Sequence, residues 1–437
     1  MVTTTASLLG QGDHPQRRAL IEEMHVRRFP SFAAPARVLQ IVVYTVEQTP
    51  ETVRRHAESL CEHYLLTAPP NGKSFSVQLS GVEFVWEQHS EFSTYSLIKP
   101  GAFTAPFAGS LLEEVPQAWL SALPGRILRA TQIALLAQSD PEPSNEWLAE
   151  LFALEELVCC DVLGGEARIW SNFRLHGDGL GRLLIRDQAL IGDGDPSRLL
   201  QRLQELGNYR NMALLGLPLA QRMTPTLSAL EQRLAELTRE ICERSEPEDQ
   251  LLHHLTTLSA DLARLEAETS YRMSATRAYA QLVADRLDSI QVRRVRGFQT
   301  LADFTDRRLT PAVRTCESFT RRLENLSQRA SWASSLMRTR IETALEHQTR
   351  DLLESMNRAA HVQLRLQQAI EGLSIIAISY YAVGLVGYMA KSVSHYFPSI
   401  DANTVAGASA PIVVLGTWWL MRRVHRRLAH AAYLGGN

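Results

Sequence analysis

The feature that most constrains this chain is an uncharged apolar run, Gly372 to Ala390, that directly continues a long amphipathic pattern. A hydrocarbon core of about 30 Å needs about 20 apolar residues in helical form, so this run is just long enough to cross a membrane. The preceding pattern starts at Pro311 and repeats apolar residues at the three- and four-residue spacing of a helix face. The sequence therefore predicts one helix that begins in water as a stalk, residues 311–371, and ends in a bilayer as a first span, residues 372–390.

The apolar positions of the stalk form a continuous seam, and the positions between them are mostly Arg, Glu and Gln. The seam consists of Val313, Cys316, Phe319, Leu323, Leu326, Ala330, Ala333, Met337, Ile341, Ala344, Leu352, Met356, Ala359, Val362, Leu366 and Ala369. Such a seam favours a coiled coil, either with another helix of the chain or with copies of the same helix.

Two sets of residues stand out where this helix enters the span. The first is a set of predicted helix-packing residues, whose small members allow close approach of a neighbouring helix: Ala377, Tyr380, Gly384 and Gly387. The second is a polar stripe that recurs every seven residues: Gln367, Ser374, Tyr381 and Tyr388. Two interpretations stay open, a packed anchor bundle and a ring of helices whose stripe lines an aqueous path. The span has no acidic residue, so a high-field ion-binding ring is not supported.

A second span is predicted at residues 405–421, after a short outer loop at residues 391–404. Trp418 and Trp419 suit the membrane interface at its end. A basic tail, residues 422–437, follows and contains Arg422, Arg423, Arg426 and Arg427. By the positive-inside rule this tail is cytoplasmic, where its arginines would ring the mouth of any path. Both termini and most of the chain are then expected on the cytoplasmic side of a bacterial inner membrane.

Residues 1–196 are predicted to form an α+β cytoplasmic domain. A β-branched run at 37–46, alternating segments from 74 to 98 and three later runs within 157–187 are of strand type, and 51–66 is helical by pattern. Residues 116–136 are ambiguous. The segment HGDGLG, His176 to Gly181, resembles a phosphate loop, but a strand pattern follows it, which favours a hairpin turn.

From Pro196 the chain is expected to be helical to its end, with residues 197–310 as a helical, coiled-coil region before the stalk. Thr224 followed by Pro225, and Thr310 followed by Pro311, are typical of helix starts. The fold class is therefore an α+β domain, a long coiled-coil stalk and a C-terminal two-helix transmembrane hairpin.

Composition argues against several function classes. The net charge of −2 gives no global field for nucleic acid. No catalytic motif is present, so the sequence predicts neither an enzyme nor a cofactor, and it assigns no metal ligands. The five cysteines form no C-x-x-C pair, which is typical of small buried hydrophobes in a reducing compartment. The first residues contain no apolar signal segment.

One cluster of titratable residues has an open role. Glu87, His89 and Glu91 alternate, so on one strand they would project from the same face. That arrangement suits a metal or acid–base site, and a solvated outer face predicts the same pattern.

Several stretches resemble a known family. They are DHPQRRALIEEMHVRRFP, FVWEQHSEFSTYSL, GNYRNMALLGLPLA and LLESMNRAAHVQLRLQQAIEGLSIIAISYYAVGLVGYMAKSV. They look like proteobacterial membrane-anchored proteins that are grouped only as a domain of unknown function, and this resemblance implies an inner-membrane protein without catalytic residues.

The architecture is also similar to that of CorA-type magnesium channels, which have an α+β cytoplasmic domain, a long stalk helix, two spans and a basic tail. Such channels carry Gly-Met-Asn at the outer end of the first span. This chain has Gly387-Tyr388-Met389-Ala390 there, without the Asn, which argues against magnesium selectivity. A weaker likeness is to anchored coiled-coil proteins of mitochondrial and yeast sporulation type, which suggests a scaffold.

The sequence thus leaves two hypotheses of function. The first is a homo-oligomeric, CorA-like channel or transporter for inorganic cations, gated by its cytoplasmic domain. The second is a non-catalytic, membrane-anchored scaffold that organises the membrane or recruits partners. In both, the expected partners are further copies of the chain and the lipid bilayer.

Overall fold

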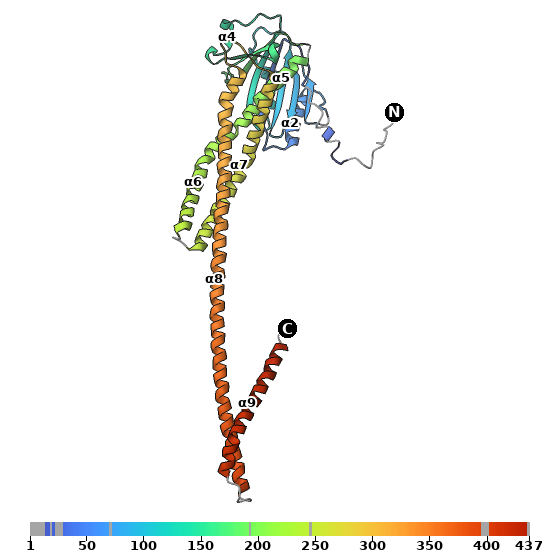
Figure 1. The fold of residues 1–437 in the computed structure, drawn as a ribbon. Helices are drawn as coiled ribbons and strands as arrows, with labels where there is room; N and C mark the ends of the chain where they lie inside the picture. Colours follow the sequence, from blue (N-terminus) through green and yellow to red (C-terminus); the bar gives the residue numbers. More distant parts are fainter. Residues whose placement is uncertain are drawn as a thin grey trace, which may run out of the picture. The chain divides into compact units, whose positions relative to one another are not determined.

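The computed structural model of the chain describes residues 14–17, 20–21, 29–69, 72–191, 194–243, 247–394 and 402–434. The chain divides into two compact units, residues 1–334 and 335–437. The first unit contains a mixed β-sheet followed by long helices, which confirms that part of the predicted fold class (Figure 1). The second contains the end of helix α8 (Leu301–Ser394) and helix α9 (Ala402–Leu434).

The described residues of the first unit form one nine-stranded sheet. Its strands are β1 (Ala36–Tyr44), β2 (Ser74–Gln78), β3 (Glu83–Gln88), β4 (Phe92–Pro100), β5 (Arg126–Leu136), β6 (Val158–Val162), β7 (Ala167–Ser171), β8 (Gly181–Asp187) and β9 (Arg293–Arg294). They lie in the order β2-β3-β4-β1-β5-β8-β7-β6-β9. All neighbours are antiparallel except β5 and β8, which run parallel with Ile133 opposite Leu183. This parallel pair joins two antiparallel halves into one sheet.

Alternation along β1 explains why both faces of the sheet are covered. Leu39, Ile41 and Val43 point to one face, where they pack with α2 (Pro50–His63). Val38 points to the other face, where it belongs to a core shared with α5 (Gly194–Leu214) and α7 (Glu248–Ile290). Because successive side chains of a strand project to opposite faces, one apolar strand serves two cores.

Short helices complete the first of these faces. They are η1 (Leu111–Glu114), α3 (Gln117–Ser121), α4 (Asn145–Leu151) and η2 (Leu154–Glu156). The short η3 (Leu163–Gly165) lies on the other face, where Leu163 packs against the core shared with α5 and α7. Trp119 of α3 packs near Phe84 and Tyr95 of the sheet, and Leu148 of α4 packs with Trp170 at the other end of the sheet. The long helices are thus confined to the opposite face, where they pack against one another.

Helices α6 (Gly216–Glu243) and α7 pack side by side, and the first part of α8 lies against them. Arg322 of α8 donates to Glu231 of α6 in a bidentate pair of 3.0 and 2.7 Å. Gly216 permits the close approach, because a Cβ added there would overlap Thr276 Oγ1 and lie 3.2 Å from Cys316 Sγ. The early seam residues of α8, from Cys316 to Ala330, are buried in this packing.

The predicted helix starts at Pro225 and Pro311 are wrong. Both prolines lie inside longer helices, α6 from Gly216 and α8 from Leu301. Thr300 caps α8 instead: its Oγ1 accepts a hydrogen bond from Asp303 N at 3.0 Å, and Asp303 Oδ2 accepts one from Thr300 N at 3.4 Å. This reciprocal pair is a capping box. A proline inside a helix removes only one N–H donor, and the packed faces of α6 and α8 outweigh that loss.

The expectation of an entirely helical chain after Pro196 is also wrong, because β9 follows α7 and pairs with the sheet edge at β6. Its two arginines carry no apolar alternation that a sequence pattern could reveal. The ambiguous stretch 116–136 contains α3 and β5. The hairpin turn at HGDGLG is confirmed: β7 and β8 are antiparallel, and His176 N donates to Leu180 O at 2.9 Å. The sequence pattern at residues 14–29 would also suit a short helix, but these residues lie largely outside the described part of the chain.

Candidate functional site

The second unit contains the predicted membrane segment. Within the described part of the chain, one helix, Leu301–Ser392, is long and apolar enough to cross a membrane by length and composition. Only 6% of its apolar window is buried, whereas the core helix of a soluble protein would be mostly covered. This exposed apolar surface makes the C-terminal part of α8 the first candidate for a functional element.

Helix α9 contacts this part of α8 through small polar side chains. Ser379 Oγ lies 2.6 Å from Thr417 Oγ1, and Ser379 is buried although it stands in an apolar run. Thr417 Oγ1 also donates to Val413 O at 2.9 Å. Hydroxyl pairs of this kind hold neighbouring helices together in apolar surroundings. Sequence analysis missed Ser379, because it followed the seam of the stalk and the contact falls on a different face.

The polar stripe lies on a different face of α8 from the Ser379–Thr417 contact; nearer the end of the helix, Tyr381 and Tyr388 also line a pocket with Asn403 of α9. At 3.6 residues per turn, Tyr381 and Tyr388 stand about 180–200° around the helix from Ser379. Both tyrosines are largely exposed in the single chain. Ser374 Oγ donates to Ile370 O at 2.8 Å, and Gln367 Nε2 donates to Glu371 Oε1 at 3.5 Å. The stripe is therefore free to face something other than α9.

The predicted helix-packing residues lie outside the Ser379–Thr417 contact, and three of them, Tyr380, Gly384 and Gly387, line the pocket that includes Asn403 of α9. Ala377, Tyr380 and Gly384 are exposed, and Gly387 is half-buried. A Cβ added at Gly384 would meet no atom within 4 Å. Their predicted role is contact between copies, which the described single chain does not test.

The basic tail continues α9 as helix. Arg422 and Arg423 stack over Trp418 and Trp419, with guanidinium carbons 4.9 and 5.0 Å from the ring centroids. The side chains of Arg426 and Arg427 lie outside the described residues. The stacking pairs suit a membrane interface, where indole rings and arginines gather.

Comparison with known families gives one match. The model for "Protein of unknown function (DUF3422)" matches residues 12–428, nearly the whole chain. The chain belongs to the DUF3422 family. No curated protein and no solved structure matches it. The family match thus agrees with the resemblance to a domain of unknown function, and it adds no support for a CorA-type relationship or a proteobacterial source.

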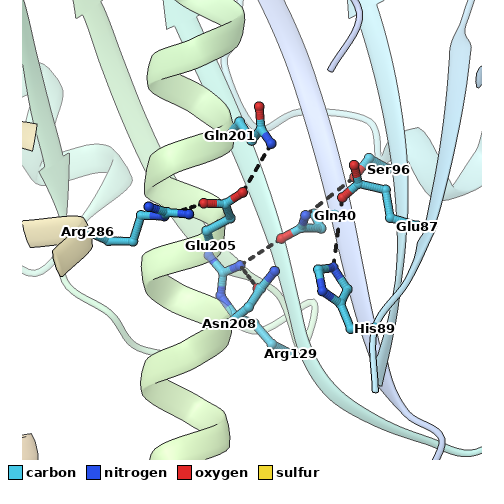
Figure 2. A network of polar contacts seen from close by, with 9 residues as sticks. All are labelled: Gln40, Glu87, His89, Ser96, Arg129, Gln201, Glu205, Asn208 and Arg286. Atoms are coloured by element: carbon cyan, nitrogen blue, oxygen red, sulfur yellow. Dashed lines mark hydrogen bonds and ion pairs between the residues drawn. The ribbon is translucent and has the colours of Figure 1, made fainter. Parts of the chain in front are cut away.

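In this DUF3422 chain, the Glu87, His89 and Glu91 cluster is not a strand face. Strand β3 ends at Gln88, so His89 and Glu91 lie in the turn before β4. Glu91 is buried and points to α7, where Arg272 Nη1 and Nη2 each donate to a carboxylate oxygen at 3.0 Å. His89 Nε2 lies 4.0 Å from Glu87 Oε2 (Figure 2). The His89 ring also stacks on Phe92. The prediction of a common face is wrong, because a turn breaks the alternation.

The turn therefore has a structural role in the DUF3422 fold. The Glu91–Arg272 pair joins the β3–β4 turn to α7. Burial of the Tyr279 hydroxyl raises the pKa of Tyr279, and the negative charge of Glu91 raises it further. Among the described residues, no group of three or more His, Cys, Asp or Glu side chains could hold a metal ion. Within the cluster, Glu91 thus holds the β3–β4 turn against α7 through Arg272.

Proposed function

We propose that this DUF3422 protein is the subunit of a homo-oligomeric membrane protein of the bacterial inner membrane. In this proposal, residues 372–390 and 405–421 form a two-helix transmembrane hairpin. The sheet domain and stalk are cytoplasmic, and the stalks of several copies form a coiled coil. The finer fold class of the sequence analysis is part of this proposal.

The observation that carries the proposal is the change in burial along the seam of α8. Met337 is fully buried, whereas Leu352 and Met356, further along the same seam, are 64% and 66% exposed. Fully burying a Leu or Met side chain gains about 1.5–3 kcal/mol, so this uncovered seam favours a partner helix. A second copy is the partner we favour, since it brings an identical seam of the same period.

Leu352 offers a direct test of this assembly. Replacing Leu352 by Asp places a charge in the seam and should dissociate the oligomer, because the charge would lose its hydration there. Leu353→Asp is the matched control, since Leu353 is 61% exposed and lies about 100° away around the helix. The measurement is the mass of the full chain in detergent. A monomeric wild type, or equal dissociation by both variants, would contradict the proposal.

The activity we propose for the assembly is passage of inorganic cations along the polar stripe, gated by the cytoplasmic domain. Support comes from the face that the half-buried Ser374 shares with the exposed Tyr381 and Tyr388, away from the Ser379–Thr417 contact. In a ring of copies this face can turn to the axis, with Arg422, Arg423, Arg426 and Arg427 at the cytoplasmic mouth. The predicted packing set, Ala377, Tyr380, Gly384 and Gly387, then lies between neighbouring copies.

Ion flux in liposomes tests this activity. Tyr381→Phe and Ser374→Ala remove hydroxyls from the stripe and should change the flux per oligomer. Tyr380→Phe is the matched control, because it removes the same hydroxyl from the neighbouring position off the stripe. Intact oligomers without flux, or flux that Tyr381→Phe and Ser374→Ala leave unchanged, would refute a conducting stripe.

The second candidate function is a membrane-tethered scaffold that recruits partners. It is favoured by the lack of any charged side chain between Gly372 and Ala390, since a cation path then has only hydroxyls and dipoles to replace water. Oligomers that carry no current but retain a protein partner on the cytoplasmic domain would support this alternative.

A further inference from the structure

Two arginines in the sheet domain, the buried Arg210 and the half-buried Arg129, have no acidic partner among the described residues. Arg210 of α5 is 9% exposed, and its side chain makes no hydrogen bond or ion pair within the described part of the chain. Its guanidinium lies over Phe173, 4.6 Å from the ring centroid, and 5.5 Å from that of Phe304. A buried cation that stacks only on apolar rings keeps its donors unused.

The second arginine is Arg129 of β5, which reaches across to α5. Its Nη1 donates to Gln40 Oε1 at 3.0 Å and to Asn208 Oδ1 at 2.9 Å (Figure 2). Both partners are neutral. Burial lowers the pKa of Arg129 to about 9, and the nearby charge of Arg210 adds to the shift. Burial likewise lowers the pKa of Arg210 to about 10. The site thus concentrates positive charge that nothing in the described chain neutralises.

The helix next to Arg129 is shaped to accommodate it. A Cβ added at Gly207 of α5 would lie 2.8 Å from Arg129 Cζ, closer than real Cβ contacts. Glycine in the middle of a helix costs about 0.5–1 kcal/mol relative to alanine. The missing side chain at Gly207 leaves the space that the Arg129 guanidinium occupies.

Both arginines line one cavity of about 140 Å³ between β5 and α5. Arg174 and Arg182 line it as well, and no Asp or Glu does so among the described residues. Arg174 pairs with Glu156, and Arg182 lies 3.4 Å from Asp178, so these charges are balanced. Arg182 Nε is nevertheless buried without a hydrogen-bond partner. The unbalanced charge of the cavity is that of Arg129 and Arg210.

Several other arginines that join two elements of this unit pair with a carboxylate: Arg272 with Glu91, Arg286 with Glu205 and Arg322 with Glu231. Others, such as Arg202, donate to a backbone carbonyl instead. An unpaired buried charge costs several kcal/mol, so a bound negative group at Arg129 and Arg210 would stabilise this part of the fold. That group is not part of the described chain.

We propose that this cavity binds a phosphate-type dianion, with Arg129 and Arg210 as its ligands. Guanidinium groups match the oxygens of phosphate in bidentate geometry, and two of them balance its charge. The cavity volume suits a single phosphate group. Arg210 also lines a neighbouring open cleft, whose charged residues are Arg174, Arg307 and Arg308 together with Glu155 and Glu156. This cleft gives the rest of a phosphomonoester a way out.

The test is binding of inorganic phosphate to the purified full chain, at constant ionic strength with chloride as the balancing anion. We expect phosphate to raise the unfolding temperature in a concentration-dependent way. Arg210→Met keeps apolar volume and should weaken phosphate binding at least about tenfold, since a charged hydrogen bond is lost. Arg198→Met is the matched control on the same helix, because Arg198 is exposed and outside the cavity.

A second variant separates the site from a general loss of structure. Gly207→Ala improves helix propensity but displaces the Arg129 guanidinium, so it should weaken phosphate binding without lowering the phosphate-free unfolding temperature. Glycerol 3-phosphate is titrated in parallel. Tighter binding of glycerol 3-phosphate than of inorganic phosphate would indicate a phosphomonoester site, and the reverse would indicate a site for free phosphate. Absence of any shift with both compounds in the wild type, or equal shifts in wild type and Arg210→Met, would overturn the proposal.

Discussion

Replacing Glu91 by Gln removes the only carboxylate that pairs with Arg272 among the described residues. The two side chains are 3% and 11% exposed, and both guanidinium–carboxylate distances are 3.0 Å, so neither charge has water as a substitute partner. Breaking a buried pair in this way costs about 3–5 kcal/mol. The variant should therefore lose about that much free energy of unfolding.

The assay is denaturant unfolding of the full chain in detergent, followed by tryptophan fluorescence, since Trp86 and Trp170 are buried in the sheet. Asp261→Asn is the matched control on α7, because the Asp261–Arg264 pair is exposed and should contribute at most about 1 kcal/mol. The double variant Glu91→Leu, Arg272→Met should recover much of the loss, since an apolar pair of similar volume leaves no unpaired charge. Two results would refute the reasoning. One is a loss of unfolding free energy no larger than that of Asp261→Asn. The other is a loss in the double variant equal to the sum of the losses for Glu91→Leu and Arg272→Met measured separately.

Four further predictions concern buried groups. Thiol labelling of the native chain should reach Cys242 and spare Cys61, Cys159, Cys160 and Cys316, which are buried. Burial raises the pKa of Cys159 to about 12 and of Cys160 to about 11, from 9.0, so between pH 9 and 11 the unfolded chain loses thiol protons that the folded chain keeps. Stability should therefore fall as pH rises through that window, and replacing both thiols by Ala should reduce the slope; an unchanged slope would contradict the assignment. Gly216→Ala should cost about 1–3 kcal/mol in the same unfolding assay, because the added methyl meets Thr276 and Cys316, and Thr276→Ala should relieve part of the loss. In phosphate-free buffer, Arg210→Met should leave the unfolding temperature unchanged or raise it, since it removes an unpaired buried charge, and a clear decrease would show that the stacked cation itself stabilises the fold.

Local patterns in the sequence were sufficient for most individual elements. The strand-type run at 37–46 and the helical pattern at 51–66 correspond to β1 and α2 to within a few residues at each end. Proline was a poor guide to helix ends: Pro225 and Pro311 look like starts, but both helices run through them. Tertiary packing overrides one missing hydrogen bond when a long apolar face is buried on either side.

The candidate sites depended far more on the tertiary structure. The alternation of Glu87, His89 and Glu91 could not show that a turn separates them, nor that Glu91 pairs with a residue 181 positions away. Arg129 and Arg210 are two among many arginines in a chain that has only three lysines. Which arginine lacks a carboxylate is decided by the elements that surround it, and no local spacing records that.

The sequence by itself determined the uncharged run from Gly372 to Ala390 and the amphipathic seam before it. Hydropathy and helical period are properties of neighbouring residues, and they persist whatever the rest of the chain does. Only the tertiary structure decided the parallel β5–β8 pair, the return of β9 to the sheet edge and the face of α8 that meets α9. Each of these joins segments far apart in the chain, so its energy comes from contacts that exist only after folding. The burial of the α8 seam is such a property, and it ends beyond Met337 because no element of the described chain covers Leu352 and Met356.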